Sequence, residues 1–242
     1  MCWNYQVSLI FSVIYVVTNS YYVVKRPLYW KQYLLFGSFY LTMEVFQTLQ
    51  WLFGNVYSDS MYGQSVCNSI NVNYTIVAFI LIWLQPILFS VIGYQTTTTN
   101  KWFFRVLTVL NCFVFFYGLK LLYGGFEKPD YYTISDSMFG SSTCTNEGET
   151  GHLVWRFKPK TLDVFPNHLT YIILCIISFV MYENNATRVI GLGWLLSLIV
   201  TKLLLAPTLV EIASSWCLLS IIANLLIVAY VHISTGIYLT GQ

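Results

Sequence analysis

Long apolar stretches, separated by short polar turns, recur along the whole chain. A helix that crosses a bilayer needs about 20 mostly apolar residues. The pattern therefore predicts an all-α, polytopic transmembrane helical bundle of seven helices. We place them at Gln6–Val24, Gln32–Gly54, Thr75–Gln95, Phe103–Tyr123, Asn167–Tyr182, Arg188–Ala206 and Thr208–Ile233. Pro207 separates the last two, because the residue before a proline is pushed out of helical conformation.

Lysine and arginine are unevenly distributed among the short connections. They follow the first, third and fifth predicted helices, and the second and sixth are followed by none. The basic residues concerned are Lys25, Arg26, Lys31, Lys101, Arg105 and Arg188. Cytoplasmic loops of membrane proteins carry an excess of Lys and Arg. We therefore predict an outer or lumenal N-terminus and a cytosolic C-terminus.

One segment outside the predicted helices is long. Residues 124–166 form a predicted outer loop between the fourth and fifth helices of a single transmembrane domain, residues 1–242. The first part of this loop is polar, and we expect it to be irregular. Its second part, "HLVWRFKPKTLDVF", alternates apolar and polar residues, and we expect it to lie along the membrane surface.

The composition supports an integral membrane location. Of 242 residues, 57% are hydrophobic and only 9% are charged, with a mean hydropathy of +0.63, whereas soluble domains are about 25% charged. The net charge of +2 and the absence of a basic run argue against a nucleic-acid partner. The lipid bilayer is the expected partner, and the oligomeric state stays open.

The second predicted helix contains an unusual polar group in "FYLTMEVFQTLQW". Glu44 is the only charged residue between Gln32 and Ser58, and Gln47 follows it on the same helix face. Charged side chains at membrane depth usually face the bundle interior or a wet cavity. The third helix adds Gln85 beside a proline. We therefore predict that Glu44, Gln47 and Gln85 form a deep polar site.

A second polar group is expected nearer the outer side. Lys120, Lys202 and Glu211 lie close to the outer ends of three predicted helices, at matching depths. Together with Glu44 they predict an outward-facing polar pocket that binds or conducts a small polar ligand or ion, as in a transporter, channel or receptor-like protein.

Two other functions stay open. Lysines near helix ends often extend to the interface, and membrane-embedded amides often hold helices together. A structural membrane protein of a viral envelope or host membrane, with no ligand, would explain the same residues. An intramembrane enzyme that uses Glu44 as an acid or base is a further alternative, although the sequence identifies no partner group for it.

The sequence contains little that would bind a cofactor. His168 and His232 are expected at opposite membrane faces, too far apart to share a tetrahedral metal site. A site outside the membrane made of His152, His168 and Glu211 stays open. The seventh predicted helix has no lysine that could hold retinal. We expect neither a cofactor nor a metal.

Four short motifs resemble an uncharacterised family of polytopic membrane proteins, found in large DNA viruses with bacterial relatives. The motifs are "MCWNYQVSL", "MEVFQTLQW", "LQP" and "EIASSWC". That family begins Met-Cys-Trp or Met-Cys-Phe, which Cys2 and Trp3 match, and Ser8 fits a serine a few residues on. The resemblance implies a topology of about seven helices and a viral or host membrane. The family has no assigned activity.

The second-helix motif departs from the family pattern Met-Gln-x-x-Glu-x-x-x-Trp. Met43 and Trp51 match its ends, but Glu44 stands where the pattern has Gln and Gln47 where it has Glu. The exchange keeps one carboxyl and one amide on the same helix face, which indicates that the pair matters together.

Cys67 and Cys144 fall in predicted outer loops, on the oxidising side of the membrane where disulfides persist. We predict a Cys67–Cys144 disulfide that fixes the long loop, with two free thiols as the alternative. Peptide mapping under non-reducing conditions is expected to recover the two cysteines in one linked peptide pair. Recovery of both as free thiols would contradict the prediction.

Overall fold

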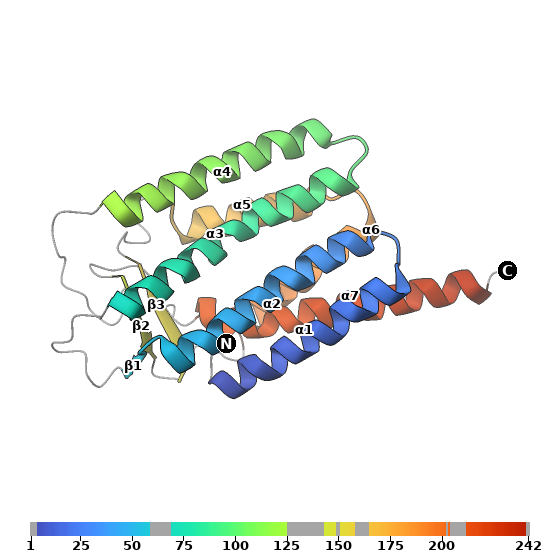
Figure 1. The fold of residues 1–242 in the computed structure, drawn as a ribbon. Coiled ribbons are helices and arrows are strands. Elements are labelled where there is room, and N and C mark those ends of the chain that lie inside the picture. Colours follow the sequence, from blue (N-terminus) through green and yellow to red (C-terminus); the bar gives the residue numbers. More distant parts are fainter. Residues whose placement is uncertain are drawn as a thin grey trace.

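Seven helices in the described part of the chain pack side by side, with a small sheet at one end (Figure 1). The computed structural model describes residues 4–58, 69–124, 143–148, 151–157, 165–201, 203 and 212–240. The helices are α1 (Tyr5–Lys25), α2 (Trp30–Phe53), α3 (Ser69–Thr96), α4 (Lys101–Gly124), α5 (His168–Val180), α6 (Asn185–Val200) and α7 (Ile212–Thr240). The predicted helical bundle is confirmed at this level.

Helix α3 lies at the centre of the bundle. It packs against α2, α4, α5 and α6, and it also contacts the sheet. Phe89 of α3 is fully buried, and its ring packs against Phe36 of α2, Phe179 of α5 and Trp194 of α6. This aromatic cluster joins four helices around one point, so α3 organises the core.

The two ends of the bundle differ. The turns between α1 and α2, between α3 and α4, and between α5 and α6 all lie at one end (Figure 1). These turns and the first helical residues after them carry the basic residues that the sequence singled out, so we call this the basic end. The strands lie at the opposite end, which we call the hairpin end.

A three-stranded sheet lies at the hairpin end. Its strands are β1 (Tyr57–Ser58), β2 (Cys144–Glu147) and β3 (Leu153–Arg156). β1 pairs with β2 in parallel, and β2 pairs with β3 as an antiparallel hairpin with Thr145 opposite Trp155.

The hairpin adds a strand that the sequence did not predict in the long loop. Leu153, Val154 and Trp155 are almost completely buried, and β3 packs against α3 and α7. That this segment lies along the membrane surface stays a prediction. The alternation of apolar and polar residues reflects a strand that packs onto the helix ends.

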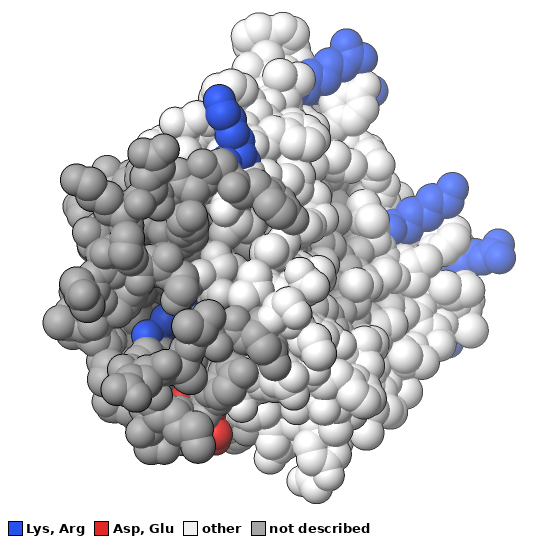
Figure 2. All heavy atoms as spheres, turned by 60° about the vertical axis from the view of Figure 1, so that its left-hand side comes forward, with Lys and Arg blue, Asp and Glu red and all other residues white. Residues whose placement is uncertain are grey.

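Three helices are long and apolar enough to cross a membrane: Tyr5–Lys25, Ser69–Thr96 and Lys101–Leu122. Shorter apolar helices lie at Leu169–Val180, Asn185–Val200 and Ser220–Ser234. Figure 2 shows a broad uncharged surface on one face of the molecule. Large apolar side chains such as Val13, Val109 and Phe116 are exposed on the outside of the bundle, as expected of a protein solvated by lipid.

Helix α3 begins six residues earlier than predicted, at Ser69 rather than Thr75. The added turns contain Asn71, which is fully buried and bonded to the hairpin and to the carbonyl of Asn55. In the sequence, Asn71 looks like the end of an apolar stretch. In the structure, the hairpin, a segment distant in the chain, pairs its side chain.

Glu183 ties two turns together at the basic end. Its carboxylate accepts hydrogen bonds from the backbone N–H groups of Thr98 (2.8 Å), Thr99 (3.2 Å) and Asn100 (2.8 Å). These amides lie directly before α4, where a negative charge also interacts favourably with the helix dipole. The neighbouring Asn184 amide donates to the carbonyl of Thr96. The α5–α6 turn is thereby attached to the α3–α4 turn.

Replacing Glu183 by Gln is expected to lower the thermal unfolding midpoint at neutral pH. Hydrogen bonds from the side chains of Thr97 and Thr99 and from backbone amides hold the pKa of Glu183 well below its usual value of 4.5. Because the folded pKa is lowered, the stabilisation is complete above the unfolded value and declines as the pH falls below about 4.5. Parent and Glu183→Gln should therefore converge in acid, in detergent-based unfolding scans.

The matched control is Glu147→Gln, at the opposite end of the bundle. It should change the midpoint at pH 7 little. An unchanged midpoint for Glu183→Gln at pH 7 would contradict the role given to the Glu183 contact.

Candidate functional site

One face of α2 carries the polar side chains that the sequence singled out. Glu44 and Gln50 are 1% and 0% exposed, and Gln47 and Tyr40 are buried beside them. Residues separated by three, four or seven positions lie on the same side of a helix. The apolar residues of α2 that remain exposed, such as Val45 and Leu49, point elsewhere. The polar face of α2 therefore points into the bundle, as predicted.

Glu44 is the described residue with two buried side-chain atoms that lack a hydrogen bond; other buried residues, such as Asn111, have one such atom each. Neither of its carboxylate oxygens makes a hydrogen bond of normal geometry within the described part of the chain. Ser8 of α1, itself fully buried, is a described side chain that interacts with the Glu44 carboxyl. A buried carboxylate is costly unless it is paired, protonated or bound to a cation. Glu44 is thus the buried carboxyl of the described chain at which a proton or a cation could be held.

Gln85 joins three helices close to Glu44. Its Oε1 accepts hydrogen bonds from the hydroxyls of Tyr40 on α2 (3.0 Å) and Tyr171 on α5 (2.8 Å), and its Nε2 contacts the sulfur of Met43 at 3.4 Å. Tyr40 and Met43 flank Glu44 on the N-terminal side. The structure therefore brings Gln85 against the Glu44 segment, although Gln85 and Glu44 share no hydrogen bond.

A second polar cluster lies where α2 meets the hairpin. Gln50 donates from Nε2 to the hydroxyl of Thr145 (2.8 Å) and accepts from the indole of Trp155 (3.0 Å). Thr145 also bonds Thr75 of α3, and its backbone N–H and carbonyl both bond the Asn71 side chain. Gln50 lies six residues beyond Glu44, about 9 Å along the helix. This cluster closes the hairpin end of the bundle above Glu44.

Asn111 and Asn224, also deep in the predicted helices, hold helices together. Asn111 of α4 donates to the carbonyl of Pro86 at 2.8 Å, and so uses the α3 segment where proline interrupts the backbone pattern. Asn224 of α7 donates to Thr18 of α1 (2.6 Å) and accepts from the hydroxyl of Tyr22 (3.1 Å). Both amides act between helices.

The structure does not test the predicted outer ring as a whole. Lys120 is exposed on α4, and Lys202 and Glu211 lie outside the described residues. Among the predicted ligand-binding residues, Glu44, Gln47 and Gln85 are buried and come from adjacent helices. The described residues therefore contain the whole deep group of the predicted pocket, but only Lys120 of its outer ring.

Cys144 is buried at the start of β2 and is disulfide-bonded. Its predicted partner Cys67 lies outside the described residues, so the Cys67–Cys144 pairing stays a prediction. Cys112 and Cys175 are the free cysteines of the described chain, and both lie in helices.

The sequence analysis missed the tyrosines. Tyr15, Tyr22, Tyr33 and Tyr40 are buried, and each donates or shares a hydrogen bond with another helix. Their spacing of seven residues within α1 and within α2 was a usable signal, because it places each pair on one helix face. The hydroxyls of these tyrosines pair the polar interior of the bundle.

No group of three or more His, Cys, Asp or Glu side chains that could hold a metal occurs among the described residues.

Residues 6–236 match the family of unknown function DUF5765, and the chain belongs to that family. No solved structure matches the chain. The match covers nearly the whole chain, as the resemblance to an uncharacterised polytopic family implied, and it includes every helix that carries the polar interior.

Replacing Gln85 by Leu is expected to destabilise the fold by about 1–3 kcal/mol, because the buried hydroxyls of Tyr40 and Tyr171 would both lose their acceptor. The matched control on the same helix is Gln95→Leu, whose side chain is exposed and bonds only the exposed Gln32. Thermal unfolding of the two variants should separate them clearly. Equal midpoints would mean that the Gln85 contacts contribute nothing to stability.

Proposed function

We propose that this member of the DUF5765 family is a multi-pass membrane protein that binds or conducts a small cation, the proton included, at a site centred on Glu44. The site combines one buried carboxyl with the neighbouring amides of Gln47 and Gln85. It is an interior site between α1, α2 and α3.

The observation that carries this proposal is the environment of Glu44. In the described chain the buried amide of Gln50 is paired by the hairpin, and those of Gln85 and Asn224 by other helices, whereas both Glu44 oxygens lack a normal hydrogen bond. A carboxylate in such surroundings is neutralised either by a proton or by a bound cation. Each of these states is a binding event.

The arrangement also favours controlled access. The Gln50–Thr145–Trp155 cluster covers the end of the bundle nearest to Glu44. Entry from the hairpin end would require the hairpin to move away from α2 and α3. In the proposed topology the hairpin end is the outer side, since the basic end carries the short Lys- and Arg-rich turns of a cytosolic face.

A structural role without a ligand is the second candidate. It is favoured by the number of amides and hydroxyls that hold helices together, such as Tyr33 on the carbonyl of Ala186 and Asn111 on that of Pro86. In that case Glu44 would be a protonated carboxyl kept for packing.

Glu44→Gln separates the two candidates, because it removes the charge and keeps the size of the side chain. The parent protein in proteoliposomes is expected to pass H⁺, Na⁺ or K⁺ down an imposed gradient, or to show a cation-dependent unfolding midpoint. Glu44→Gln should lose at least tenfold in flux, or lose the cation dependence, while remaining folded.

Thr48→Val is the matched control, since Thr48 is buried one turn further along α2 and its hydroxyl bonds only the Glu44 carbonyl. It should keep the parent response. A parent protein that shows neither flux nor cation dependence, or a Glu44→Gln variant that behaves like the parent, would overturn the proposal in favour of the structural role.

A further inference from the structure

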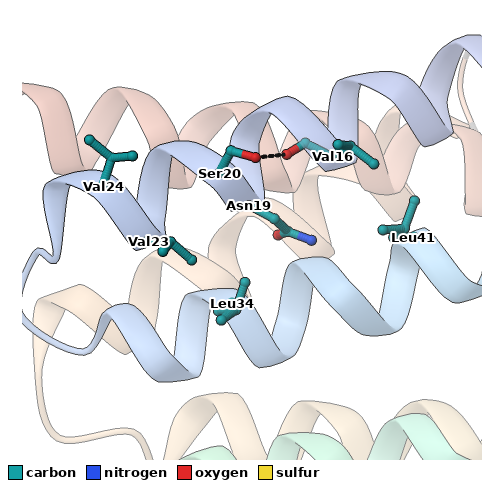
Figure 3. A pocket seen from close by; sticks show the side chains of 7 residues that line it. All are labelled: Val16, Asn19, Ser20, Val23, Val24, Leu34 and Leu41. Carbon is teal, nitrogen blue, oxygen red and sulfur yellow. Dashed lines mark hydrogen bonds between the residues drawn. The ribbon is translucent and has the colours of Figure 1, made fainter.

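A shallow groove runs along the outer surface between α1 and α2. It encloses about 460 Å³ and is lined by Val16, Asn19, Ser20, Val23, Val24, Leu34 and Leu41. Figure 3 shows Leu34 and Leu41 rising from α2 to meet the α1 side chains, with Asn19 between the two helices. Five of the seven lining residues are aliphatic, so the groove offers an apolar surface on the lipid side of the bundle.

The groove is largely apolar although two polar residues, Asn19 and Ser20, line it. The Ser20 hydroxyl donates to the carbonyl of Val16 at 2.8 Å, within its own helix. Asn19 is 8% exposed and lies at the floor, where its Nδ2 approaches the Ser38 hydroxyl at 3.4 Å. Its Oδ1 packs against Gly37, where a Cβ would collide with it. The glycine therefore allows Asn19 to lie between the two helices.

One end of the groove opens onto a basic turn. Val24 precedes Lys25, and the turn continues through Arg26 to Lys31. Lys25, Arg26 and Lys31 are all exposed. The cationic groups of Arg26 and Lys31 each lie 5.8 Å from the Trp30 ring, and a tryptophan beside basic residues is typical of the headgroup region. From Val24 to Val16 the groove extends about 12 Å towards the bundle centre.

The α1–α2 turn is also the basic turn without a competing acid. At the α3–α4 turn, Arg105 donates to the hydroxyl of Tyr94 at 3.0 Å, and the Glu183 carboxylate lies on the adjoining amides. Residues 25–31 contain no Asp or Glu. A negative headgroup therefore meets uncompensated positive charge at Lys25, Arg26 and Lys31.

We infer that this groove is a binding site for an anionic phospholipid, with part of one acyl chain along the apolar lining and the phosphate against Lys25, Arg26 and Lys31. The inference rests on the proposed membrane-spanning location. The charge complementarity at the basic turn and the continuous apolar groove below it both match the two chemical parts of such a lipid. A helix from a second copy of the chain would complement the apolar lining, but it would not account for the positive charge at the basic turn.

The test uses the full-length protein in detergent with equal amounts of dioleoyl phosphatidylglycerol and dioleoyl phosphatidylcholine, observed by native mass spectrometry. We expect one phosphatidylglycerol to be retained in preference to phosphatidylcholine. Lys25→Gln and Lys31→Gln should each reduce this preference about fivefold, as expected for a basic residue near an anionic lipid. Lys101→Gln, at the other basic turn, should leave it unchanged.

A second pair of variants tests the groove itself. Ser20→Phe places a ring in the groove and should reduce retention of both lipids several-fold. Its control is Thr42→Phe, an exposed position outside the groove whose hydroxyl likewise bonds the carbonyl four residues earlier. Unfolding midpoints close to the parent value would show that both variants fold.

The outcomes separate the two proposals. Release of the protein from membranes by an alkaline carbonate wash would overturn the membrane-spanning proposal. Retention in membranes with equal binding of the two lipids, or with Ser20→Phe behaving like Thr42→Phe, would overturn the lipid site alone. A dimer that Ser20→Phe dissociates would assign the groove to a second copy and would also overturn it.

Discussion

Hydrogen bonds that cross between helices determine how this bundle is assembled. Lipid offers no partners to polar side chains, so an amide or hydroxyl in a membrane helix must find one on a neighbouring element. Gln85 illustrates this constraint, because one side-chain oxygen serves the hydroxyls of Tyr40 and Tyr171 and so fixes α2, α3 and α5 relative to one another. Asn224 does the same for α7 and α1.

Against this background Glu44 is informative because it does not follow the rule. Tyr40 on the same helix is paired to α3 and Gln50 to the hairpin, whereas the Glu44 oxygens have no hydrogen bond among the described residues. Evidence for a site in this bundle therefore comes from the one buried carboxyl of the described residues, because both of its oxygens lack a hydrogen bond there.

The two ends of the bundle are stabilised by different means. At the hairpin end a strand pair packs onto the helices, and Thr145 exchanges hydrogen bonds with α2 and α3. At the basic end the α5–α6 turn is attached through Glu183 to the amides before α4. The α1–α2 turn takes no part in the Glu183 contact, and its positive charges stay exposed beside an apolar groove. This asymmetry places the inferred lipid site at that turn.

Much of the architecture could be read from the sequence. Apolar runs with basic turns indicated seven helices and placed Lys25, Lys101 and Arg188 at one end, because helix length and hydropathy are local properties. The burial of Glu44, Gln47 and Gln85 also followed, since a polar group at membrane depth is expected to face inward. The strands were missed, because residues 153–156 owe their burial to packing against helices distant in the chain.

The tertiary structure alone decided which polar groups form hydrogen bonds with one another. Gln85 is paired with residues 45 and 86 positions away, and Gln50 with Thr145, 95 positions away. No local pattern encodes such partners, because they depend on how the helices pack around α3. The sequence by itself determined that Glu44 is buried. Only the packed bundle decided that Tyr40 and Gln50 are paired, whereas both Glu44 oxygens lack a hydrogen bond within the described residues.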